Sequence, residues 1–533
     1  MRKYLTSVSG ADVRTYHADG TWQPTTLLDV VSARAESNPG GLGLQDSQHR
    51  LDNAAVLRAV RCAAGALRSA GVRAGDPVLL QLRNSAAYAI ADVAVSALGG
   101  VLVPLKTSMA PTEITAVAQR VRSLFVIMSS DFDERAHELQ AAGLTVFTDE
   151  HLWAAVDDPA GPGWEVSERQ ADADAPLNIM FSSGTTGVPK GIMNSSNTQL
   201  CSVRAMNDDL ALTADDPWLI VPPMAHNAGW LYSFMPALLS GAPAIFQERF
   251  DPVQTLELLS RHEIHGVFLT PTHAVDVMAA VADGSAAPTA LRYIIIGGAA
   301  TPPDMKAALR ATLDAEVISM YGSTENQGVT FVRPGSDPAH SDLTVGWPCA
   351  TNELAIMDVD RRTPLPAGEV GEIATRGAST FIGYFDDQAA TDAAFNDDGW
   401  FLSGDLGLLD EQGALRMTGR RKELIIRGGL NITPDDVEQA LAEHPSLERI
   451  AAVGIPDDRL GERVCAVVVA RDGVDLTTIT TYLRDRGVGT HLWPEAVLCV
   501  DSFPLTDIGK VQRGQLRDLA LDALRRGVLE RKG

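Results

Sequence analysis

Up to residue ~330, short apolar runs alternate with helix-like segments, a pattern typical of parallel α/β layers. The strand candidates are residues 76–82, 100–105, 124–129, 176–183, 217–223, 266–272 and 291–298. Several of these runs are followed by glycine or threonine and then by a helical stretch. Because ligands in such sheets bind at the carboxyl ends of the strands, the residues directly after these runs are the first candidates for a binding site.

The pattern changes twice after residue ~330. Residues ~340–418 are short, turn-rich and strand-like, which predicts a small antiparallel β unit. The tail from residue ~423 predicts a helix at 433–445, strands at 450–456 and 463–470, another helix and an irregular end. A chain of 533 residues is too long for one hydrophobic core. We therefore expect the tail to form a separate small α+β domain.

Composition narrows the class of protein. With 45% hydrophobic and 21% charged residues the chain is ordinary for a globular protein, and its net charge of −24 argues against nucleic-acid binding. The most apolar window, residues 86–105, contains Asp92 and a Gly99-Gly100 break, so it predicts a buried helix and strand rather than a membrane span. No secretory signal is visible, and five scattered cysteines without a CxxC pair indicate reduced thiols in a cytoplasm.

The stretch SSGTTGVPKG (182–191) follows an apolar run and is nearly all backbone and hydroxyl. Such a loop presents N–H and O–H groups to phosphate oxygens. It differs from a Walker A loop, in which the lysine directly follows a glycine and precedes Ser or Thr. The chain has 44 lysines and arginines, of which only seven are lysine, and one of the seven is Lys190 in this loop. A compact ammonium is therefore used here in a chain that otherwise prefers guanidinium.

Other polar stretches carry candidate chemistry beside a simpler structural explanation. The glycines at 297–298 let a flat ring approach the backbone, although a strand-to-helix turn explains them more simply. Glu325, at the end of an apolar strand, suits Mg²⁺ or a helix N-terminus. Asp405 suits ribose hydroxyls or a tight turn. Taken alone, Lys422 reads as part of a charged linker and Lys510 as a solvated surface lysine.

Seven stretches in order resemble the motifs of the adenylate-forming superfamily, which includes acyl-CoA synthetases, luciferases and peptide-synthetase adenylation domains. They are SSGTTGVPKG, HNAG, GGA, YGSTE, SGDLG, GRRKELIIRGG and LTDIGK. The resemblance covers essentially the whole chain and points to the AMP-dependent carboxylate-CoA ligase branch. It implies an N-terminal adenylation domain (1–421) of layered α/β sheets with a small β-barrel-like unit. A mobile C-terminal α+β lid domain (422–533) follows.

The resemblance implies two half-reactions, with ATP, Mg²⁺ and CoA as cofactors and substrates. A carboxylate attacks the α-phosphate of ATP to give an acyl-adenylate and pyrophosphate, and a thiol then displaces AMP. The implied holders of the β- and γ-phosphates are Ser182, Ser183, Gly184, Thr185, Thr186, Gly187 and Lys190. The implied adenine site consists of Gly298, Ala299, Ala300, Tyr321 and Gly322.

The remaining implied roles divide between chemistry and domain movement. Thr324 resembles the α-phosphate donor, Glu325 the Mg²⁺ ligand, and Asp405 the ribose anchor, with Arg420 beside it. Lys510 resembles the lysine that bridges the carboxylate and the α-phosphate. Lys422 matches the hinge about which the small domain rotates, and Gly428 and Gly429 match the loop that lines the pantetheine tunnel. The sequence departs from the family after PKGI, where a histidine often follows within three to five residues. Here the text is MNSSNT.

Residues 222–234 (PPMAHNAGWLYSF) match the segment that lines the acyl pocket. His226 matches its gating aromatic residue, and the other implied acid-binding residues are Asn227, Gly229, Trp230, Gly298 and Gly322. Asn227 follows the histidine as in the hydroxybenzoate-activating branch, whereas the surrounding text resembles ligases of cyclohexanecarboxylate and medium-chain acids. A buried Asn without a partner is costly, so either the acid carries a polar substituent or Asn227 bonds backbone. We expect an aryl, alicyclic or medium-chain acid.

The acceptor has alternatives. CoA leads, because no carrier domain is fused and GRRKELIIRGG resembles CoA ligases. A carrier-protein thiol is second, and ATP activation of another small group, such as nitrite for diazotisation of an aryl amine, is third. A non-catalytic nucleotide-binding protein would be expected to lack Lys510 or Glu325, and both are present. We expect no nucleic-acid partner and no membrane insertion, and whether the chain forms a homodimer stays open.

Overall fold

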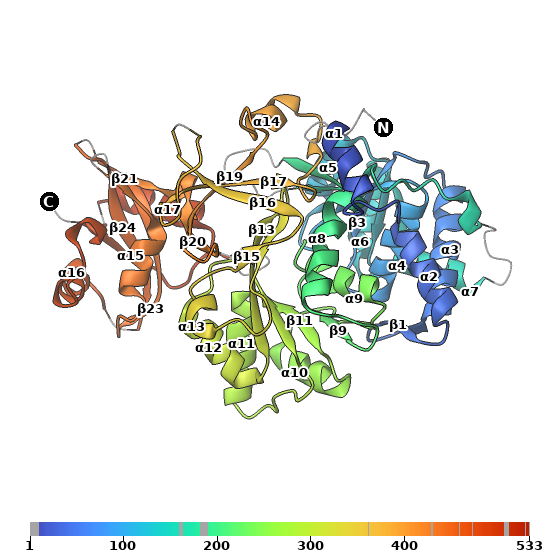
Figure 1. The fold of residues 1–533 in the computed structure, drawn as a ribbon, viewed down its shortest axis with the longest axis horizontal. Coiled ribbons are helices and arrows are strands. Elements are labelled where there is room, and N and C mark those ends of the chain that lie inside the picture. The colour runs from blue at the N-terminus through green and yellow to red at the C-terminus, as the bar shows by residue number, and fades with distance from the viewer. Residues whose placement is uncertain are drawn as a thin grey trace. The chain divides into compact units, whose positions relative to one another are not determined.

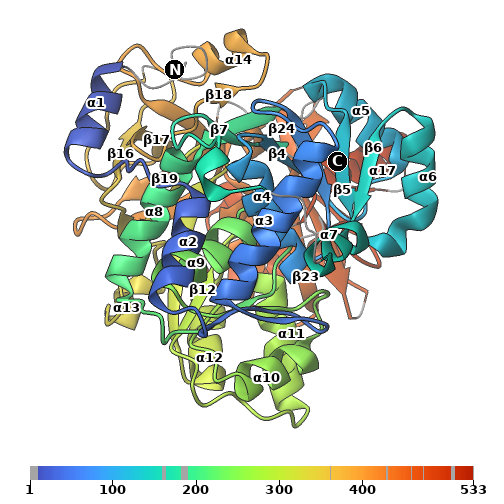
Figure 2. The same cartoon turned by 90° about the vertical axis from the view of Figure 1, so that its right-hand side faces the viewer.

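The chain folds as two compact units, which Figures 1 and 2 show in two views. The computed structural model describes residues 10–158, 164–181, 190–360, 362–427, 430–457, 459–471, 473–505, 511–527 and 529–531. Unit 1 comprises Met1–Leu354 and Thr375–Phe401, and unit 2 comprises Ala355–Ala374 and Leu402–Gly533. The chain passes from one unit to the other within two strands and at the start of a third. The functional boundary predicted at 421/422 stays a prediction.

The first sheet of unit 1 is mostly parallel. Its strands in spatial order are β15 (Trp347–Pro348), β14 (Gln327–Phe331), β13 (Glu316–Ser323), β12 (Tyr293–Ile296), β11 (Gly266–Leu269), β9 (Trp218–Ile220), β10 (Ala244–Phe246), β1 (Leu42–Gln45) and β2 (Arg50–Asp52). The six strands from β13 to β1 run parallel, and β14, β15 and β2 pair antiparallel at the two ends.

Three helices lie beside this sheet, as Figure 1 shows: α10 (Pro252–Arg261), α11 (Pro271–Ala282) and α12 (Pro303–Leu313). Each begins with proline, whose fixed φ suits the first turn. Asp251 and Thr270 cap α10 and α11 by accepting a hydrogen bond from the backbone N–H three residues on. Their apolar faces pack on the sheet in one buried cluster.

The second sheet of unit 1 has the same plan. Its strands in spatial order are β18 (Gly383–Tyr384), β8 (Gly191–Ser195), β7 (Pro176–Phe181), β4 (Val101–Pro104), β3 (Pro77–Gln81), β5 (Phe125–Met128) and β6 (Thr145–Thr148). The strands from β7 to β6 are parallel, and β8 and β18 are antiparallel. Together the two sheets confirm the layered α/β fold, and β3, β4, β5, β7, β9, β11 and β12 all lie within the predicted ranges.

Helices α2 (Leu27–Ser37), α3 (Asn53–Ser69) and α4 (Ala86–Ala97) lie side by side, as Figure 2 shows. Every residue of α4 is buried, and the chain then enters β4. This confirms the buried helix and strand predicted for residues 86–105. Among the helices that the structure describes, none is both long and apolar enough to cross a membrane.

Further helices complete unit 1. They are α1 (Gly10–Ala18), α5 (Pro111–Val121), α6 (Asp133–Ala141), α7 (Asp149–Asp157), α8 (Ser196–Asp209), the π-helix η3 (Trp230–Phe234), α9 (Met235–Ser240), α13 (Pro338–Ser341) and α14 (Gln388–Ala393), with 3₁₀ turns η1 (Ser130–Phe132) and η2 (Val166–Glu168).

The predicted β unit forms a four-stranded sheet in the order β16 (Asn352–Met357), β17 (Gly371–Gly377), β19 (Phe401–Leu409) and β20 (Leu415–Arg420). The C-terminal sheet contains β22 (Leu430–Ile432), β21 (Ile425–Arg427), β24 (Gly461–Ala470), β25 (Ala496–Cys499) and β26 (Glu530–Arg531), with β23 (Leu447–Asp457) paired to β24. Its helices are α15 (Pro434–Leu441), α16 (Leu476–Asp485) and α17 (Arg513–Arg525), with 3₁₀ turns η4 (Arg421–Glu423) and η5 (Thr490–Leu492). The α+β tail is therefore confirmed.

The predicted irregular end of the chain is wrong, because α17 occupies residues 513–525. Its buried residues Leu516, Ala520 and Ala523 recur at helical spacing. Two of the three are alanines, so the apolar stripe is thin and its period is easily missed. The helix packs on β23 and β24 within unit 2.

Candidate active site

The predicted phosphate loop joins two paired strands. β7 ends at Phe181, β8 begins at Gly191, and these two residues are register partners in an antiparallel pair. The loop therefore follows an apolar strand, as expected. Ser182, Ser183, Gly184, Thr185, Thr186 and Gly187 lie outside the described residues. Lys190 is described and exposed, and its ammonium lies 4.4 Å from the centroid of the Tyr384 ring, a cation–π distance.

The same tyrosine contacts the predicted metal ligand. The Tyr384 hydroxyl donates to Glu325 Oε1 at 3.2 Å, and Ser323 Oγ lies 3.0 Å from Glu325 Oε2. Each oxygen of the Glu325 carboxylate is thus held by a different hydroxyl. Burial raises the pKa of Tyr384, and the Glu325 carboxylate raises it further, so the phenol stays a donor at neutral pH. Lys190, Tyr384 and Glu325 form one contiguous polar group on unit 1.

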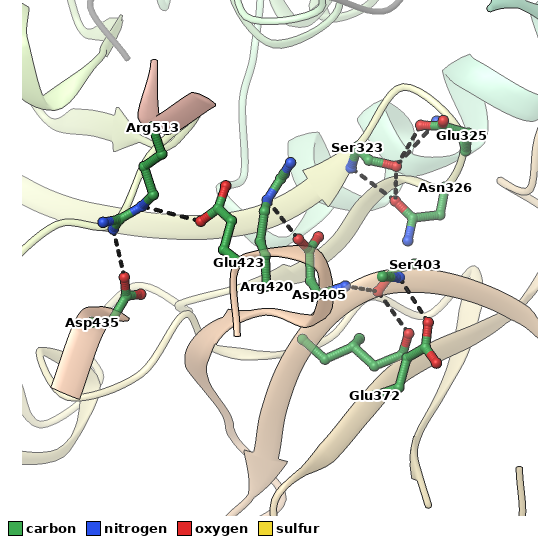
Figure 3. A network of polar contacts seen from close by, with 12 residues as sticks. Ser323, Glu325, Asn326, Glu372, Ser403, Asp405, Arg420, Glu423, Asp435 and Arg513 are labelled. Atoms are coloured by element: carbon green, nitrogen blue, oxygen red, sulfur yellow. Dashed lines mark hydrogen bonds and ion pairs between the residues drawn. The ribbon is translucent and has the colours of Figure 1, made fainter. Parts of the chain in front are cut away.

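A tight turn fixes the backbone of this group. Asn326 is buried, and its Oδ1 accepts from the Ser323 backbone N–H at 2.8 Å, as Figure 3 shows with the Ser323–Glu325 contact. The turn requires glycine at 322, because a Cβ there would lie 1.6 Å from the carbonyl oxygen of Gln327. Thr324 and Glu325 therefore project from a turn whose geometry the neighbouring strand dictates.

The carboxylate of Glu325 fits Mg²⁺ as one ligand among several. Hard cations of this kind take oxygen donors and are commonly held by one or two carboxylates together with phosphate oxygens and water. Among the described residues, no group of three or more His, Cys, Asp or Glu could hold a metal by itself. A site that relies on substrate oxygens is therefore the one that these residues suit.

The predicted adenine-binding residues follow neighbouring parallel strands. Gly298 follows β12, Tyr321 lies near the end of β13, and the two strands pair in parallel with Ile296 opposite Ser319. Gly298 has φ +86°, a left-handed conformation that favours glycine, and it is exposed together with Ala299 and Ala300. Tyr321 is buried. The topology thus brings both predicted elements to the same edge of the sheet.

The predicted acyl segment folds into a compact turn and a π-helix. Gly229 permits a close approach, because a Cβ there would lie 2.3 Å from the carbonyl oxygens of Pro222 and Pro223. Trp230 begins η3, and its indole N–H donates to Asp92 Oδ2 at 2.9 Å. His226 lies in the turn and is partly exposed. π-helical turns are frequent at functional sites, which suits a pocket wall.

Asn227 bonds a side chain rather than the backbone. Its Nδ2 donates to Gln327 Oε1 at 3.0 Å. Its Oδ1 is buried and has no hydrogen-bond partner. The alternative in which the Asn227 amide is satisfied by backbone atoms is therefore wrong.

The predicted ribose anchor lies in unit 2. Asp405 on β19 and Arg420 on β20 are cross-strand partners, and Arg420 Nε lies 2.9 Å from Asp405 Oδ1. The Asp405 backbone N–H donates to Ser403 Oγ at 3.1 Å, and Gly404 N–H donates to Glu372 at 3.0 Å (Figure 3). The side chain of Asp405 is 7% exposed and that of Arg420 47% exposed. Arg420 thus lies beside Asp405, and the role of the two residues toward ribose stays a prediction.

The C-terminal candidates are only partly described. Lys510, Gly428 and Gly429 lie outside the described residues, and Lys422 lies in η4. Close to Lys510 in sequence, Arg513 at the start of α17 pairs with Glu423 at 3.1 Å and Asp435 at 2.8 Å (Figure 3). It also pairs with Glu438. Burial alone lowers the pKa of Arg513, but these carboxylates more than reverse this effect, so its pKa is raised.

Sequence reasoning missed three residues of the site. Tyr384 lies 59 residues from Glu325, and nothing local in GYFDD marks it as a partner. Gln327 lies two residues after the YGSTE motif and Asn194 lies in the stretch MNSSNT, and neither residue type suggested a role there. The one available signal was an amide side chain in or near three separate motifs.

Comparison with known proteins agrees with this geometry. A sequence model described as AMP-binding enzyme matches residues 31–385, and one described as AMP-binding enzyme C-terminal domain matches residues 436–510. The chain is 29% identical to the medium-chain fatty-acid–CoA ligase of Escherichia coli, covering 97% of this chain and 94% of that protein. It is 32% identical to the salicyl-AMP ligase / salicyl-S-ArCP synthetase of Mycobacterium tuberculosis, covering 95% and 93%.

The fold is also shared with a solved structure. ATP-bound MatB from Rhodopseudomonas palustris superposes with a TM-score of 0.84 at 25% identity, covering 93% of this chain and 99% of that one. The adenylate-forming fold expected from the motifs is thus confirmed. The names of these relatives give no support to the nitrite-activating alternative.

Proposed function

This chain belongs to the AMP-binding enzyme family, and we propose that it is an AMP-forming ligase that joins a carboxylic acid to CoA. A carboxylate is a poor electrophile, and attachment to AMP makes it a good one. The carboxylate attacks the α-phosphate of ATP and pyrophosphate leaves. The thiol then attacks the acyl carbon, a thioester forms and AMP leaves.

The observation that carries this proposal is the group formed by Lys190, Tyr384 and Glu325. Charge accumulates on the phosphates during the first half-reaction, and preorganised cations and donors stabilise it. Glu325 would hold Mg²⁺, which would supply positive charge beside the phosphates. Tyr384 holds Glu325 and lies against Lys190, so the residues assigned to the metal and to the outer phosphates are oriented together. Lys510 would donate to the reacting carboxylate and the α-phosphate.

For the acid we propose an aryl, alicyclic or medium-chain carboxylate with a polar substituent. The relatives named above act on a medium-chain fatty acid and on salicylate, an aryl acid, so both of these classes of acid occur among the relatives. The buried, unpartnered Asn227 Oδ1 supports a polar substituent, because an unsatisfied buried acceptor costs about 1–3 kcal/mol. A hydroxyl or amino group on the acid would supply the missing donor.

A carrier-protein thiol is the second candidate acceptor. The relative named salicyl-S-ArCP synthetase favours it, whereas the relative named as a CoA ligase favours CoA. Gly428 and Gly429 would line the tunnel that either pantetheine arm enters, and Lys422 would be the hinge. We also propose a cytoplasmic location, as expected from the cysteines. The partner that we propose is a carrier protein or a second copy of the chain.

The test is ATP-dependent pyrophosphate release with a panel of aryl, alicyclic and medium-chain acids, with and without CoA, and with products identified by mass. An acyl-CoA product from one class of acid would support the ligase and name its substrate. Acyl-AMP without a thioester would direct the assay to carrier proteins. Absence of pyrophosphate release with every acid would overturn the proposal.

A further inference from the structure

Three segments that the sequence assigns to different ligands meet at one buried side chain. Gln327 is the first residue of β14 and is 0% exposed. Its φ is +54°, a left-handed conformation that is uncommon for residues other than glycine. A glutamine is kept in this conformation at the end of the turn that carries Thr324 and Glu325. Unfavourable backbone conformations cluster at functional sites, so this one suggests a functional role for the Gln327 side chain.

The side chain of Gln327 makes three hydrogen bonds. Its Nε2 donates to Asn194 Oδ1 and to the Thr324 carbonyl oxygen, each at 2.8 Å. Its Oε1 accepts from Asn227 Nδ2 at 3.0 Å. Asn194, on β8 shortly after Lys190, also donates to the Thr324 carbonyl oxygen, at 3.2 Å. We call Asn194, Gln327 and Asn227 the amide relay.

Only one assignment of donors and acceptors is consistent for the amide relay. The Thr324 carbonyl oxygen can only accept, so the amide nitrogens of Asn194 and Gln327 must face it. Both hydrogens of Gln327 Nε2 are then used, and its Oε1 must face Asn227. The nitrogen of Asn227 therefore points at Gln327, and Asn227 Oδ1 is left as an acceptor without a partner. The Thr324 carbonyl, next to the predicted metal ligand Glu325, thus determines that Asn227 has its oxygen, and not its nitrogen, without a partner.

We propose that Gln327 is a positioning residue that couples binding of the acid to formation of the adenylate. A donor on the acid that reaches Asn227 Oδ1 strengthens the Asn227–Gln327 bond, and Gln327 in turn holds the turn of Thr324. Asn194, in the stretch MNSSNT that follows Lys190, supplies a donor and an acceptor to this network. This inference rests on the proposed function, since it assumes that residues 226–230 face the acid.

The direct test compares two buried glutamines. Gln327→Met removes the three hydrogen bonds and keeps the length of the side chain. Gln81→Met is the matched control, because Gln81 is also 0% exposed and its Nε2 donates to two backbone carbonyls, those of Lys106 and Met109 at 3.0 and 2.9 Å. Melting temperature, ATP affinity, and KM and kcat for pyrophosphate release are measured for both variants with the acid chosen from the panel.

We expect Gln327→Met to raise the KM for the acid and lower kcat, each by about tenfold, while the Kd for ATP stays within about threefold. Gln81→Met is expected to change the melting temperature but neither KM nor kcat beyond about threefold. Equal kinetics for the two variants would overturn the proposal. If the wild-type protein releases no pyrophosphate with any acid, the proposed function fails, and this inference fails with it.

A second measurement applies even where Gln327→Met does not fold. Asn194→Ala, Asn227→Ala and the double variant form a cycle in which Gln327 is unchanged. Among the described residues, Gln327 bonds both asparagines, so their effects on kcat/KM for the acid should be non-additive by about fivefold or more. Additive effects would show that the relay carries no coupling.

Discussion

Tyr384 shows how a single side chain joins two predicted functions. Its ring lies under the Lys190 ammonium, and its hydroxyl donates to Glu325. The two contacts use different parts of the residue, so they can be removed separately. A phenylalanine at 384 keeps the ring and removes the hydroxyl, whereas a leucine removes both.

Tyr384→Phe is expected to raise the Mg²⁺ concentration needed for half-maximal pyrophosphate release, because Glu325 loses one of its two hydroxyl partners. A hydrogen bond to a charged group contributes about 1.5–3 kcal/mol, so we expect a shift of roughly tenfold. Tyr384→Leu should in addition raise the KM for ATP. Tyr293→Phe is the control, because Tyr293 is also buried and its hydroxyl accepts from Arg292, outside this polar group. An unchanged Mg²⁺ requirement in Tyr384→Phe would remove the hydroxyl from this role.

Asp92 is a carboxyl placed inside an apolar helix. It is 2% exposed, and burial raises its pKa to about 7, although the indole N–H of Trp230 opposes this rise. It shares a small cavity with Asn178, whose Oδ1 has no hydrogen-bond partner. A neutral carboxyl has an O–H to donate, so these surroundings suit the protonated form.

The raised pKa makes stability depend on pH in a defined direction. The folded state binds this proton more tightly than the unfolded state, so the contribution is full below about pH 4 and is lost as pH rises to about 7. Asp92→Asn keeps the acceptor for Trp230 and cannot ionise. We expect the variant to be more stable than the wild type at pH 8, by roughly 2–4 kcal/mol, and about equally stable at pH 4.5. Thermal unfolding at the two pH values checks this, and an equal difference at both would contradict it.

At the scale of secondary structure, the β13–β14 hairpin and α17 differ in how visible they are in the sequence. The sequence of the hairpin shows an apolar strand followed by a glycine-containing turn. Glycine is needed at 322 because the Gln327 carbonyl oxygen lies too close for a Cβ. Helix α17 has a thin stripe of one leucine and two alanines, so its period is weak. Besides this apolar packing, Arg513 at its start pairs with three acidic residues from the range 423–438.

Arg513→Met is expected to destabilise unit 2. Its side chain is 19% exposed, and its removal would leave Glu423, Asp435 and Glu438 close together without a cation. Breaking a mostly buried ion-pair cluster typically costs about 3 kcal/mol or more. Because Lys510 lies three residues before Arg513, we also expect adenylate formation to fall. Limited proteolysis of the C-terminal segment and pyrophosphate release measure the two effects.

Arg525→Met on the same helix is the control. Its pair with Asp522 is exposed, at 75% and 59% of the two side chains, and such surface pairs contribute little. If both arginine variants are equally stable, the cluster around Arg513 does not anchor α17.

At the scale of the whole molecule, the family assigns different half-reactions to different lysines. Lys510→Ala should lose adenylate formation, by about a hundredfold or more if the lysine stabilises charge in the transition state. It should keep the transfer of a supplied acyl-adenylate to CoA, because the proposed function gives this ammonium no part in that step. Lys532→Ala, which removes a lysine outside every motif, is the control. Equal loss of both steps in Lys510→Ala would contradict separate roles for the two half-reactions.

The sequence by itself determined the α/β class, the order of the motifs and seven strands of the two parallel sheets. Apolar runs such as 291–298 predict strands because burial of consecutive side chains is a local property of the chain. The resemblance also implies that Arg420 lies beside Asp405, and the β19–β20 hairpin brings the two side chains together. The tail beyond Lys510 was misjudged, since a helix with few large apolar residues leaves little periodic signal.

Only the tertiary structure decided which polar groups meet. Glu325 and Tyr384 are 59 residues apart, Asn227 and Gln327 are 100 apart, and Asn194 and Gln327 are 133 apart. Hydrogen bonds over such separations depend on how the sheets and the acyl segment pack, and no local pattern encodes that packing. Buried polar groups must nevertheless find partners, so the packing that satisfies the amides of Asn194 and Gln327 also selects Asn227 Oδ1 as the acceptor that is left.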